Sequence, residues 1–92
     1  MKRIRAIVQG TVQGVGFRYS AAAEADRIGV MGWVRNVGSD SVEAEVQGDE
    51  RQVDEMQKWL RHGPPSATVE GVEVTDLETV AGEAEFQIIT SV

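Results

Sequence analysis

The chain has 92 residues, 41% of them hydrophobic, which is enough apolar material for the core of one domain. It contains no cysteine and a single histidine, which excludes disulfides and thiolate metal sites and makes a histidine-based metal site improbable. The net charge of −6 argues against nucleic acid as a partner. Because no signal-peptide or membrane-span pattern is present, we expect a cytoplasmic protein.

The first predicted elements are a strand, a glycine-containing loop and a helix. Residues 3–9 place apolar side chains at every second position, which is typical of a strand. The loop 10–16 follows, and residues 17–28 then carry apolar side chains at helical spacing. This stripe consists of Phe17, Ala21, Ala25 and Ile28. Gly29 is a typical residue for the end of a helix.

The middle of the chain predicts two strands, residues 30–37 and 41–48. Apolar and polar side chains alternate along 41–48, as expected for an antiparallel strand with one exposed face. The connection 38–40 is short and polar, so the two strands should form a hairpin. Arg35 is expected to pair with Glu43 or Glu45 across it.

A second helix is expected to begin at Asp49. Asp49 suits the N-cap and Gln52 stands three residues later, which together predict a capping box. The apolar stripe of this helix consists of Val53, Met56, Trp59 and Leu60. Asp54 and Lys58 have the spacing of a helical ion pair. The Gly-Pro-Pro sequence at 63–65 should end the helix.

Two further strands, residues 69–77 and 86–90, are predicted after the second helix, with a loop at 79–83. The order is then βαββαβ, with the last strand split in two. In this arrangement both helices cover one face of an antiparallel sheet. The predicted fold class is therefore α+β: a ferredoxin-like sandwich formed by a single domain, residues 1–92.

The sequence Gln-Gly-Val-Gly-Phe-Arg at residues 13–18 indicates an oxyanion site. Two glycines in a tight turn from strand to helix let the backbone come close to a ligand. The N–H groups at the helix start have no partner within the helix, and the helix dipole favours negative charge there. Arg18 adds a planar guanidinium that fits two phosphate oxygens.

The distribution of charge along the chain favours the same interpretation. Residues 1–23 hold four basic side chains and no acidic one, so they carry +4. Residues 24–92 hold all 15 acidic side chains and the other five basic ones, so they carry −10. The functional interpretation is a local anion site in a protein that otherwise repels anions. Chance clustering of solvated arginines on a strand is the alternative.

Several common types of catalytic site are missing from the sequence. No Gly-Lys-Ser/Thr follows the glycine loop, and the third glycine of a dinucleotide-binding fingerprint is absent. No serine has a suitable histidine base, because His62 fits a solvated charge at a helix end better than a ligand or catalyst. We therefore expect neither metal nor cofactor. What remains is anion binding, or action on a phosphate ester or anhydride that needs only positioning and charge stabilisation.

Asn36 stands near the end of the strand predicted at 30–37 and could reach the same end of the sheet as the glycine loop. An amide donates and accepts hydrogen bonds at once, but it is no base at neutral pH. Its useful role would be to hold and orient a water molecule. The alternative is an ordinary turn asparagine before Gly38.

Together these stretches resemble the acylphosphatase family. Its first motif is a glycine, two residues, Gln-Gly-Val, one residue, an aromatic or Met, then Arg; residues 10–18 read GTVQGVGFR. Its second, Gly-aromatic-Val-basic-Asn, stands at 32–36 as GWVRN, and GPPSATV at 63–69 resembles the family's Gly-Pro-x-x-Ala-x-Val. The resemblance covers nearly the whole chain. One departure leaves the hairpin turn open: the family usually has Asp-Gly or Asn-Gly where this chain has Ser39 and Asp40.

The resemblance implies a metal-independent hydrolase that cleaves the carboxyl–phosphate bond of small acyl phosphates. Asn36 would orient the attacking water, and the substrate's own phosphate would accept its proton. The phosphoryl group would be bound by the Arg18 guanidinium and by the backbone amides of Gly14, Val15, Gly16, Phe17 and Arg18. Inorganic phosphate would be a product or inhibitor. We expect a monomer with a small-molecule substrate, and neither nucleic acid nor membrane as a partner.

Three alternatives share the fold. A non-catalytic anion-binding or regulatory module would keep the glycine loop, but it would have no need of Asn36. An RNA-binding domain requires basic charge and exposed aromatic side chains, which five aromatic residues and a net charge of −6 disfavour. A metal carrier would require a cysteine pair, which is absent.

Overall fold

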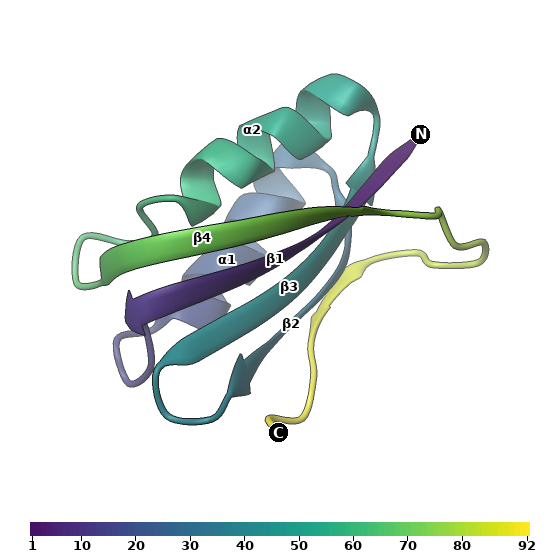
Figure 1. Cartoon of the computed structure of the whole chain (residues 1–92). Helices are drawn as coiled ribbons and strands as arrows, with labels where there is room; N and C mark the ends of the chain where they lie inside the picture. Colours follow the sequence, from purple (N-terminus) through teal and green to yellow (C-terminus); the bar gives the residue numbers. More distant parts are fainter.

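Seven elements make up the computed structural model, which describes residues 1–92. In chain order they are β1 (Lys2–Thr11), α1 (Phe17–Ile28), β2 (Met31–Val37), β3 (Ser41–Gly48), α2 (Glu50–Leu60), β4 (Thr68–Leu77) and β5 (Phe86–Ile88). The strands form one sheet in the order β4-β1-β3-β2-β5, and both helices lie on the same face of it (Figure 1). The predicted ferredoxin-like α+β sandwich is confirmed. The longest helix has 12 residues, and none is long and apolar enough to cross a membrane.

The core lies between the sheet and the two helices. Alternate residues of β1 and β3 turn toward the helices, because successive side chains of a strand point to opposite faces. The buried apolar residues that β1 and β3 contribute are Ile4, Ala6, Val8, Val42, Ala44 and Val46. The helices face them with Phe17, Ala21, Ala25, Val53, Met56 and Leu60, which are buried, and with Ile28 and Trp59, which are partly buried. The apolar stripes predicted from the sequence therefore form this core.

The last strand differs from the prediction. β5 does not continue β4 but lies at the opposite edge of the sheet, where it pairs with β2 in parallel, with Val34 opposite Ile88. Beyond β5 the chain stays beside β2, because the Val92 N–H donates to the Asn36 carbonyl oxygen at 3.0 Å. The expected antiparallel pairing therefore holds for every strand pair except β2 and β5, and the sheet is mixed. The alternation of apolar and polar side chains is the same for a strand at either edge of the sheet. The sequence pattern therefore could not show which strand β5 would pair with.

The turn between β2 and β3 has a glycine just before its tip, Gly38, and none at the tip itself, which consists of Ser39 and Asp40. Gly38 has a φ of 61°, and no residue other than glycine has a positive φ anywhere in the chain. Ser39 and Asp40 therefore need no left-handed conformation. The predicted hairpin forms, and its register runs up to Val37 opposite Ser41.

The second helix begins as predicted but forms a different ion pair. The Asp49 carboxylate accepts from the Gln52 N–H at 2.8 Å, and the Gln52 side chain accepts from the Asp49 N–H at 3.0 Å, so the capping box is present. Asp54, however, pairs with Lys2 at 3.5 Å and not with Lys58. The fold brings the start of β1 beside α2, a neighbour that helical spacing alone could not reveal.

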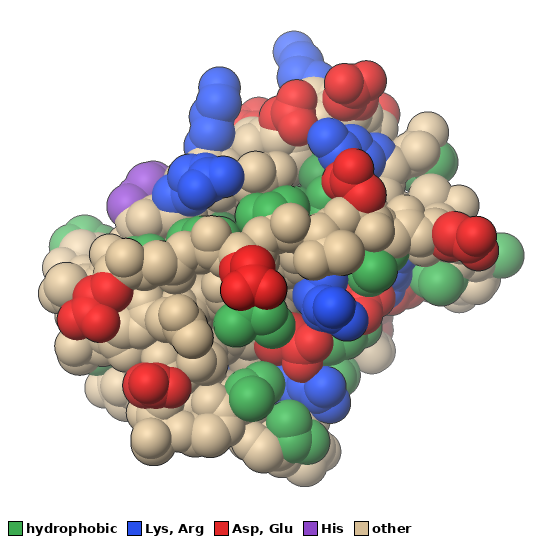
Figure 2. Space-filling view, in the orientation of Figure 1, with side chains coloured by type: hydrophobic (Ala, Val, Ile, Leu, Met, Phe, Trp, Pro, Cys, Tyr) green, Lys and Arg blue, Asp and Glu red, His purple; other side chains and the backbone are tan.

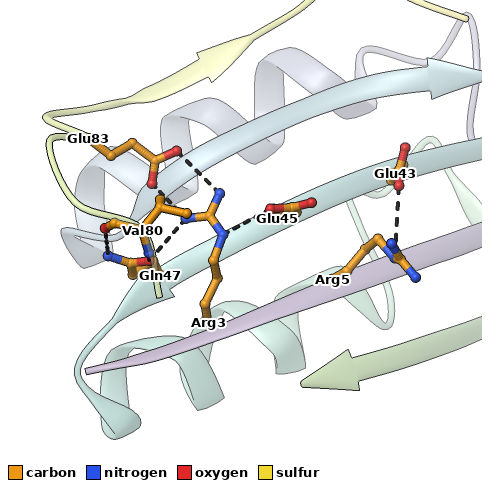
Figure 3. Close-up of polar contacts among 7 residues, drawn as sticks. All are labelled: Arg3, Arg5, Glu43, Glu45, Gln47, Val80 and Glu83. Carbon is orange, nitrogen blue, oxygen red and sulfur yellow. Dashed lines mark hydrogen bonds and ion pairs between the residues drawn. The ribbon is translucent and has the colours of Figure 1, made fainter. Parts of the chain in front are cut away.

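The face of the sheet opposite the helices carries paired charges. Arg3 is only 3% exposed and donates to Glu45 at 2.9 Å, to Glu83 at 2.8 Å and to Gln47 at 3.1 Å (Figure 3). Gln47 also bonds both the N–H and the carbonyl oxygen of Val80, each at 2.9 Å. These contacts fix the loop between β4 and β5 over the start of β1.

Glu43 joins two arginines farther along the same face. Arg35 donates to Glu43 at 2.9 Å, as one of the two predicted pairings, and lies 5.0 Å from the ring centre of Trp33. Arg5 lies 3.9 Å from the same carboxylate. Figure 2 shows acidic and basic side chains interspersed in this view of the molecule. Such a surface is neither basic nor broadly aromatic, which disfavours the RNA-binding alternative.

Candidate functional site

The loop between β1 and α1 leaves a series of backbone N–H groups without partners. Gly14 and Gly16 have φ values of 73° and 76°, and a Cβ at either would meet no atom within 4 Å. Glycine is therefore required by the backbone conformation and not by lack of space. The N–H groups of residues 14–18 donate no hydrogen bond within the chain, and Gly16 offers no side chain to cap α1. The turn thus presents several donors together.

Arg18 lies in the first turn of α1, where it is half-buried and forms no ion pair. That turn contains no acidic residue, whereas α2 begins with a capping Asp49 and with Glu50 in its first turn. A cation at the positive end of a helix is unfavourable by about 0.3–1 kcal/mol. An anion bound between Arg18 and the free N–H groups would reverse this repulsion.

The rest of the basic amino-terminal segment does not contribute to this loop. Its other three cations are each engaged with carboxylates of the sheet, of α2 or of the loop between β4 and β5: Lys2 with Asp54, Arg3 with Glu45 and Glu83, and Arg5 with Glu43. The interpretation that the +4 charge of the segment marks an anion site is therefore wrong for these three cations, and for Arg18 it stays a prediction. Charge counted along the chain could not show which cations the fold neutralises.

Asn36 lies at the end of the sheet where the glycine loop begins. It stands opposite Val42 of β3, and Val42 stands opposite Val8 of β1, four residues before the loop that follows Thr11. Two strand spacings separate Asn36 from Val8, about 10 Å. Alternation along β2 puts the Asn36 side chain on the same face as the fully buried Val34, which is the face that α1 covers. The sequence expectation that Asn36 reaches this end of the sheet is thus met.

The Asn36 side-chain oxygen Oδ1 is buried and accepts no hydrogen bond. It is the only buried side-chain nitrogen or oxygen in the chain without a partner. Leaving such an acceptor unpaired costs about 1–3 kcal/mol, so its retention calls for a role. The backbone of Asn36 is held on both sides, by β3 and by the Val92 N–H. A fixed amide with a free acceptor suits the binding of a water molecule.

Gln13 connects the glycine loop to the hairpin that carries Asn36. Its side-chain amide Nε2 donates toward three carbonyl oxygens, those of Val37 at 3.3 Å, Gly38 at 3.0 Å and Ser41 at 2.9 Å. The Gly10 N–H adds a backbone bond to the Asp40 carbonyl oxygen at 3.0 Å. Sequence reasoning assigned Gln13 no role, because its partners are main-chain atoms more than 20 residues away. On the opposite side of the loop, the Ser66 hydroxyl donates to the Val15 carbonyl oxygen at 2.8 Å.

No other part of the molecule competes with this site. His62 is exposed at the end of α2, with Nδ1 2.7 Å from the Gly63 carbonyl oxygen, as expected for a residue without a catalytic role. No group of three or more histidine, aspartate or glutamate side chains could hold a metal ion. The one surface hollow lies on α2 and is lined by Asp54, Gln57, Lys58 and Arg61. It has no apolar lining that would receive an acyl group.

Comparisons with known proteins agree on one family. The family model described as Acylphosphatase matches residues 4–88. The acylphosphatase of Anaeromyxobacter dehalogenans is 48% identical over 86 residues, 94% of this chain and 92% of that protein. That of Rubrobacter xylanophilus is 47% identical over 87 residues, 95% of this chain and 79% of that protein. The crystal structure of acylphosphatase from Bacillus subtilis matches with a TM-score of 0.91 at 36% identity, covering 97% of this chain and 99% of that one.

Proposed function

Since the chain belongs to the acylphosphatase family and is an acyl phosphate hydrolase, we propose that its reaction takes place between the glycine loop and Asn36. The amides of Gly14, Val15, Gly16, Phe17 and Arg18, with the Arg18 guanidinium, bind the phosphoryl oxygens. Asn36 holds the attacking water. No metal ion or cofactor takes part.

Unpaired polar groups at one end of the sheet support these roles. The N–H groups of residues 14–18 and the buried Asn36 Oδ1 make no hydrogen bond within the chain. Free donors suit an anion, and a free acceptor suits a water O–H. That both kinds of group lie at the same end of one sheet is the observation that carries the proposal.

The chemistry requires only orientation and charge stabilisation. The water oxygen forms a bond to phosphorus while the bond from phosphorus to the acyl oxygen breaks, and the bonding pair leaves with the carboxylate. A carboxylate is a stable leaving group near neutral pH, so no general acid is needed. The water proton passes to a phosphoryl oxygen. Arg18 stabilises the charge on the equatorial oxygens of the transition state, and the amides hold these oxygens in substrate and transition state alike.

A hydrolysis assay with an aromatic acyl phosphate tests the proposal. The wild-type protein should hydrolyse it without added metal, and a chelator should leave the rate unchanged. Arg18→Gln should reduce kcat/KM by at least about a hundredfold, because it removes the cation facing the transferred phosphoryl group. Arg51→Gln is the matched control, since Arg51 is an exposed arginine of α2 without an ion pair. Full activity in Arg18→Gln, or loss of wild-type activity on addition of a chelator, would overturn the proposed function.

The alternative of a non-catalytic module is not favoured, because the curated relatives that match nearly the whole chain are acylphosphatases. We also propose that the enzyme acts as a monomer. The large hydrophobic side chains that are exposed, those of Met1, Tyr19, Val80 and Val92, come from separate segments. Sedimentation equilibrium at micromolar concentration should report a mass near 10.0 kDa, and a mass twice as large would contradict it. The cytoplasmic location is proposed from the sequence alone.

A further inference from the structure

Ser66 lies in the segment that joins α2 to β4 and has no place in the mechanism described so far. Its hydroxyl donates a hydrogen bond to the carbonyl oxygen of Val15, 51 residues earlier in the chain, at 2.8 Å. Val15 stands between Gly14 and Gly16, at the centre of the glycine loop. The two segments meet at the same end of the sheet (Figure 1). The Ser66 hydroxyl therefore bonds the backbone of the loop.

This hydrogen bond sets the orientation of the peptide unit between Val15 and Gly16. The chain contains no cis peptide bond, and the C=O and N–H of a planar trans unit point in opposite directions. Because the Val15 carbonyl points to Ser66, the Gly16 N–H must point away from the α2–β4 segment. There it donates to no residue of the chain and is free for a ligand.

The local sequence alone would not hold this peptide unit in place. Rotation of the unit changes φ of Gly16, which stands at 76°, and glycine adopts positive and negative φ almost equally well. A Cβ at Gly16 would meet no atom within 4 Å, so no neighbour packs against the Cβ side of Gly16, whereas the Val15 side chain packs partly against the core. The Ser66 hydroxyl supplies a restraint that the glycine lacks.

Ser66 is itself held on a well-ordered segment. The Gly63 N–H donates to the Trp59 carbonyl oxygen at 2.8 Å, and the Ala67 N–H to the Pro64 carbonyl oxygen at 3.0 Å. Gly63 is buried against the ring of Phe17, the first residue of α1, where a Cβ would overlap the ring. Consecutive prolines at 64 and 65 restrict φ further. The hydroxyl is thus presented at a defined position relative to the start of α1.

We propose that Ser66 is a positioning residue for phosphate binding, which holds the Gly16 N–H in the orientation that donates to a phosphoryl oxygen. This inference rests on the proposed role of the glycine loop. The family pattern Gly-Pro-x-x-Ala-x-Val does not specify the residue at the position of Ser66. Because the amide contacts substrate and transition state alike, its loss changes binding and not kcat.

Kinetics of Ser66→Ala test the inference. KM for an aromatic acyl phosphate and the inhibition constant of inorganic phosphate should both rise about threefold to tenfold, with kcat within twofold of wild type. Ser66→Thr keeps the hydroxyl at an exposed position and should restore both constants. Thr79→Ala, in the exposed loop after β4, is the control for loss of a hydroxyl. In nitrogen-15 NMR spectra, the addition of inorganic phosphate should shift the amide resonance of Gly16 less in Ser66→Ala than in wild type.

The outcomes separate this inference from the function on which it rests. If Arg18→Gln weakens phosphate inhibition while Ser66→Ala changes neither KM nor inhibition, the role of Ser66 is wrong and the phosphate site stands. If neither variant weakens phosphate inhibition, the glycine loop is not the phosphate site and both proposals fail. A lower melting temperature of Ser66→Ala with unchanged KM would show a purely structural contact and would also overturn the inference.

Discussion

The side-chain amide of Gln13 lies 2.9 Å from the carbonyl oxygen of Ser41 and so ties the glycine loop to the first residue of β3. The same amide approaches the carbonyl oxygens of Val37 and Gly38, the two residues that follow Asn36. The proposed phosphate-binding amides and the proposed water-binding side chain are therefore connected through one glutamine. We therefore expect the position of Gln13 to affect the distance between the proposed water and the phosphoryl group.

Gln13→Met should lower kcat more than it weakens phosphate binding. Methionine keeps the length of the side chain but donates no hydrogen bond, so the loop and the hairpin lose their side-chain link and keep only the backbone bond from Gly10 to Asp40. We expect kcat to fall about tenfold to a hundredfold, because small displacements of reacting groups are costly. The inhibition constant of phosphate should change less than threefold. Gln57→Met on α2 is the control, and unchanged kcat in Gln13→Met would disprove the link.

Asn36→Ala should lose turnover without losing stability. The substitution removes the proposed water-binding amide, so kcat should fall by at least about a hundredfold while phosphate inhibition persists. It also removes a buried acceptor that has no partner, so the free energy of unfolding should stay the same or rise by up to about 1 kcal/mol. Kinetics and urea unfolding on one preparation check both parts. Substantial activity in the variant would contradict the role of Asn36.

Local patterns were sufficient to predict most elements of this fold. The helix at Phe17–Ile28 and the strand at Ser41–Gly48 have the predicted limits, and Gly29 ends α1 with its N–H on the Ala25 carbonyl oxygen. The capping box at Asp49 was likewise visible, because its two partners are three residues apart. Signals of this kind depend on neighbours along the chain, which a sequence displays directly.

Contacts between distant segments could not be predicted in the same way. The pairing of β5 with β2 in parallel, the ion pair of Lys2 with Asp54, and the bonds of Gln13 and Ser66 all join residues remote in sequence. For Gln13 and Ser66 the acceptors are backbone carbonyls, which carry no signal in the amino-acid sequence. The motif residues of the site could be identified from the sequence, but the contacts that hold them in place could not.

Glu24→Gln should weaken the protein at neutral pH and less so in acid. A hydrogen bond from Arg27, at 2.7 Å, lowers the pKa of Glu24 below its ordinary value of 4.5. A lowered pKa stabilises the fold above the unfolded-state pKa, and this contribution disappears as the pH falls through the folded-state pKa. The urea midpoint of Glu24→Gln should therefore be slightly below that of wild type at pH 7, and the difference should shrink steadily as the pH falls below 4.5. A difference that does not shrink in acid would contradict the linkage; Glu78→Gln is the control.

Arg3→Met should destabilise the fold while leaving catalysis intact. The substitution leaves Glu45 and Glu83 facing each other without the cation that now joins them, and an uncompensated, partly buried charge costs about 2–4 kcal/mol. The hydrogen bond with Glu83 also raises the pKa of Arg3, so the cation is present at every practical pH. Arg3 lies at the opposite end of β1 from the glycine loop, about 23 Å for the seven residues to Gly10, so kcat/KM should not change.

Urea unfolding of three variants would check this expectation. Arg5→Met is the matched control on the same strand and face, because Arg5 is 43% exposed and 3.9 Å from its carboxylate, and its loss should cost less than about 1 kcal/mol. The double variant, Arg3→Met with Glu83→Met, also removes the carboxylate that Arg3→Met leaves unpaired. It should therefore recover part of the lost free energy of unfolding. An Arg3→Met protein as stable as Arg5→Met would mean that the loop between β4 and β5 is held by Gln47 and Val80 alone.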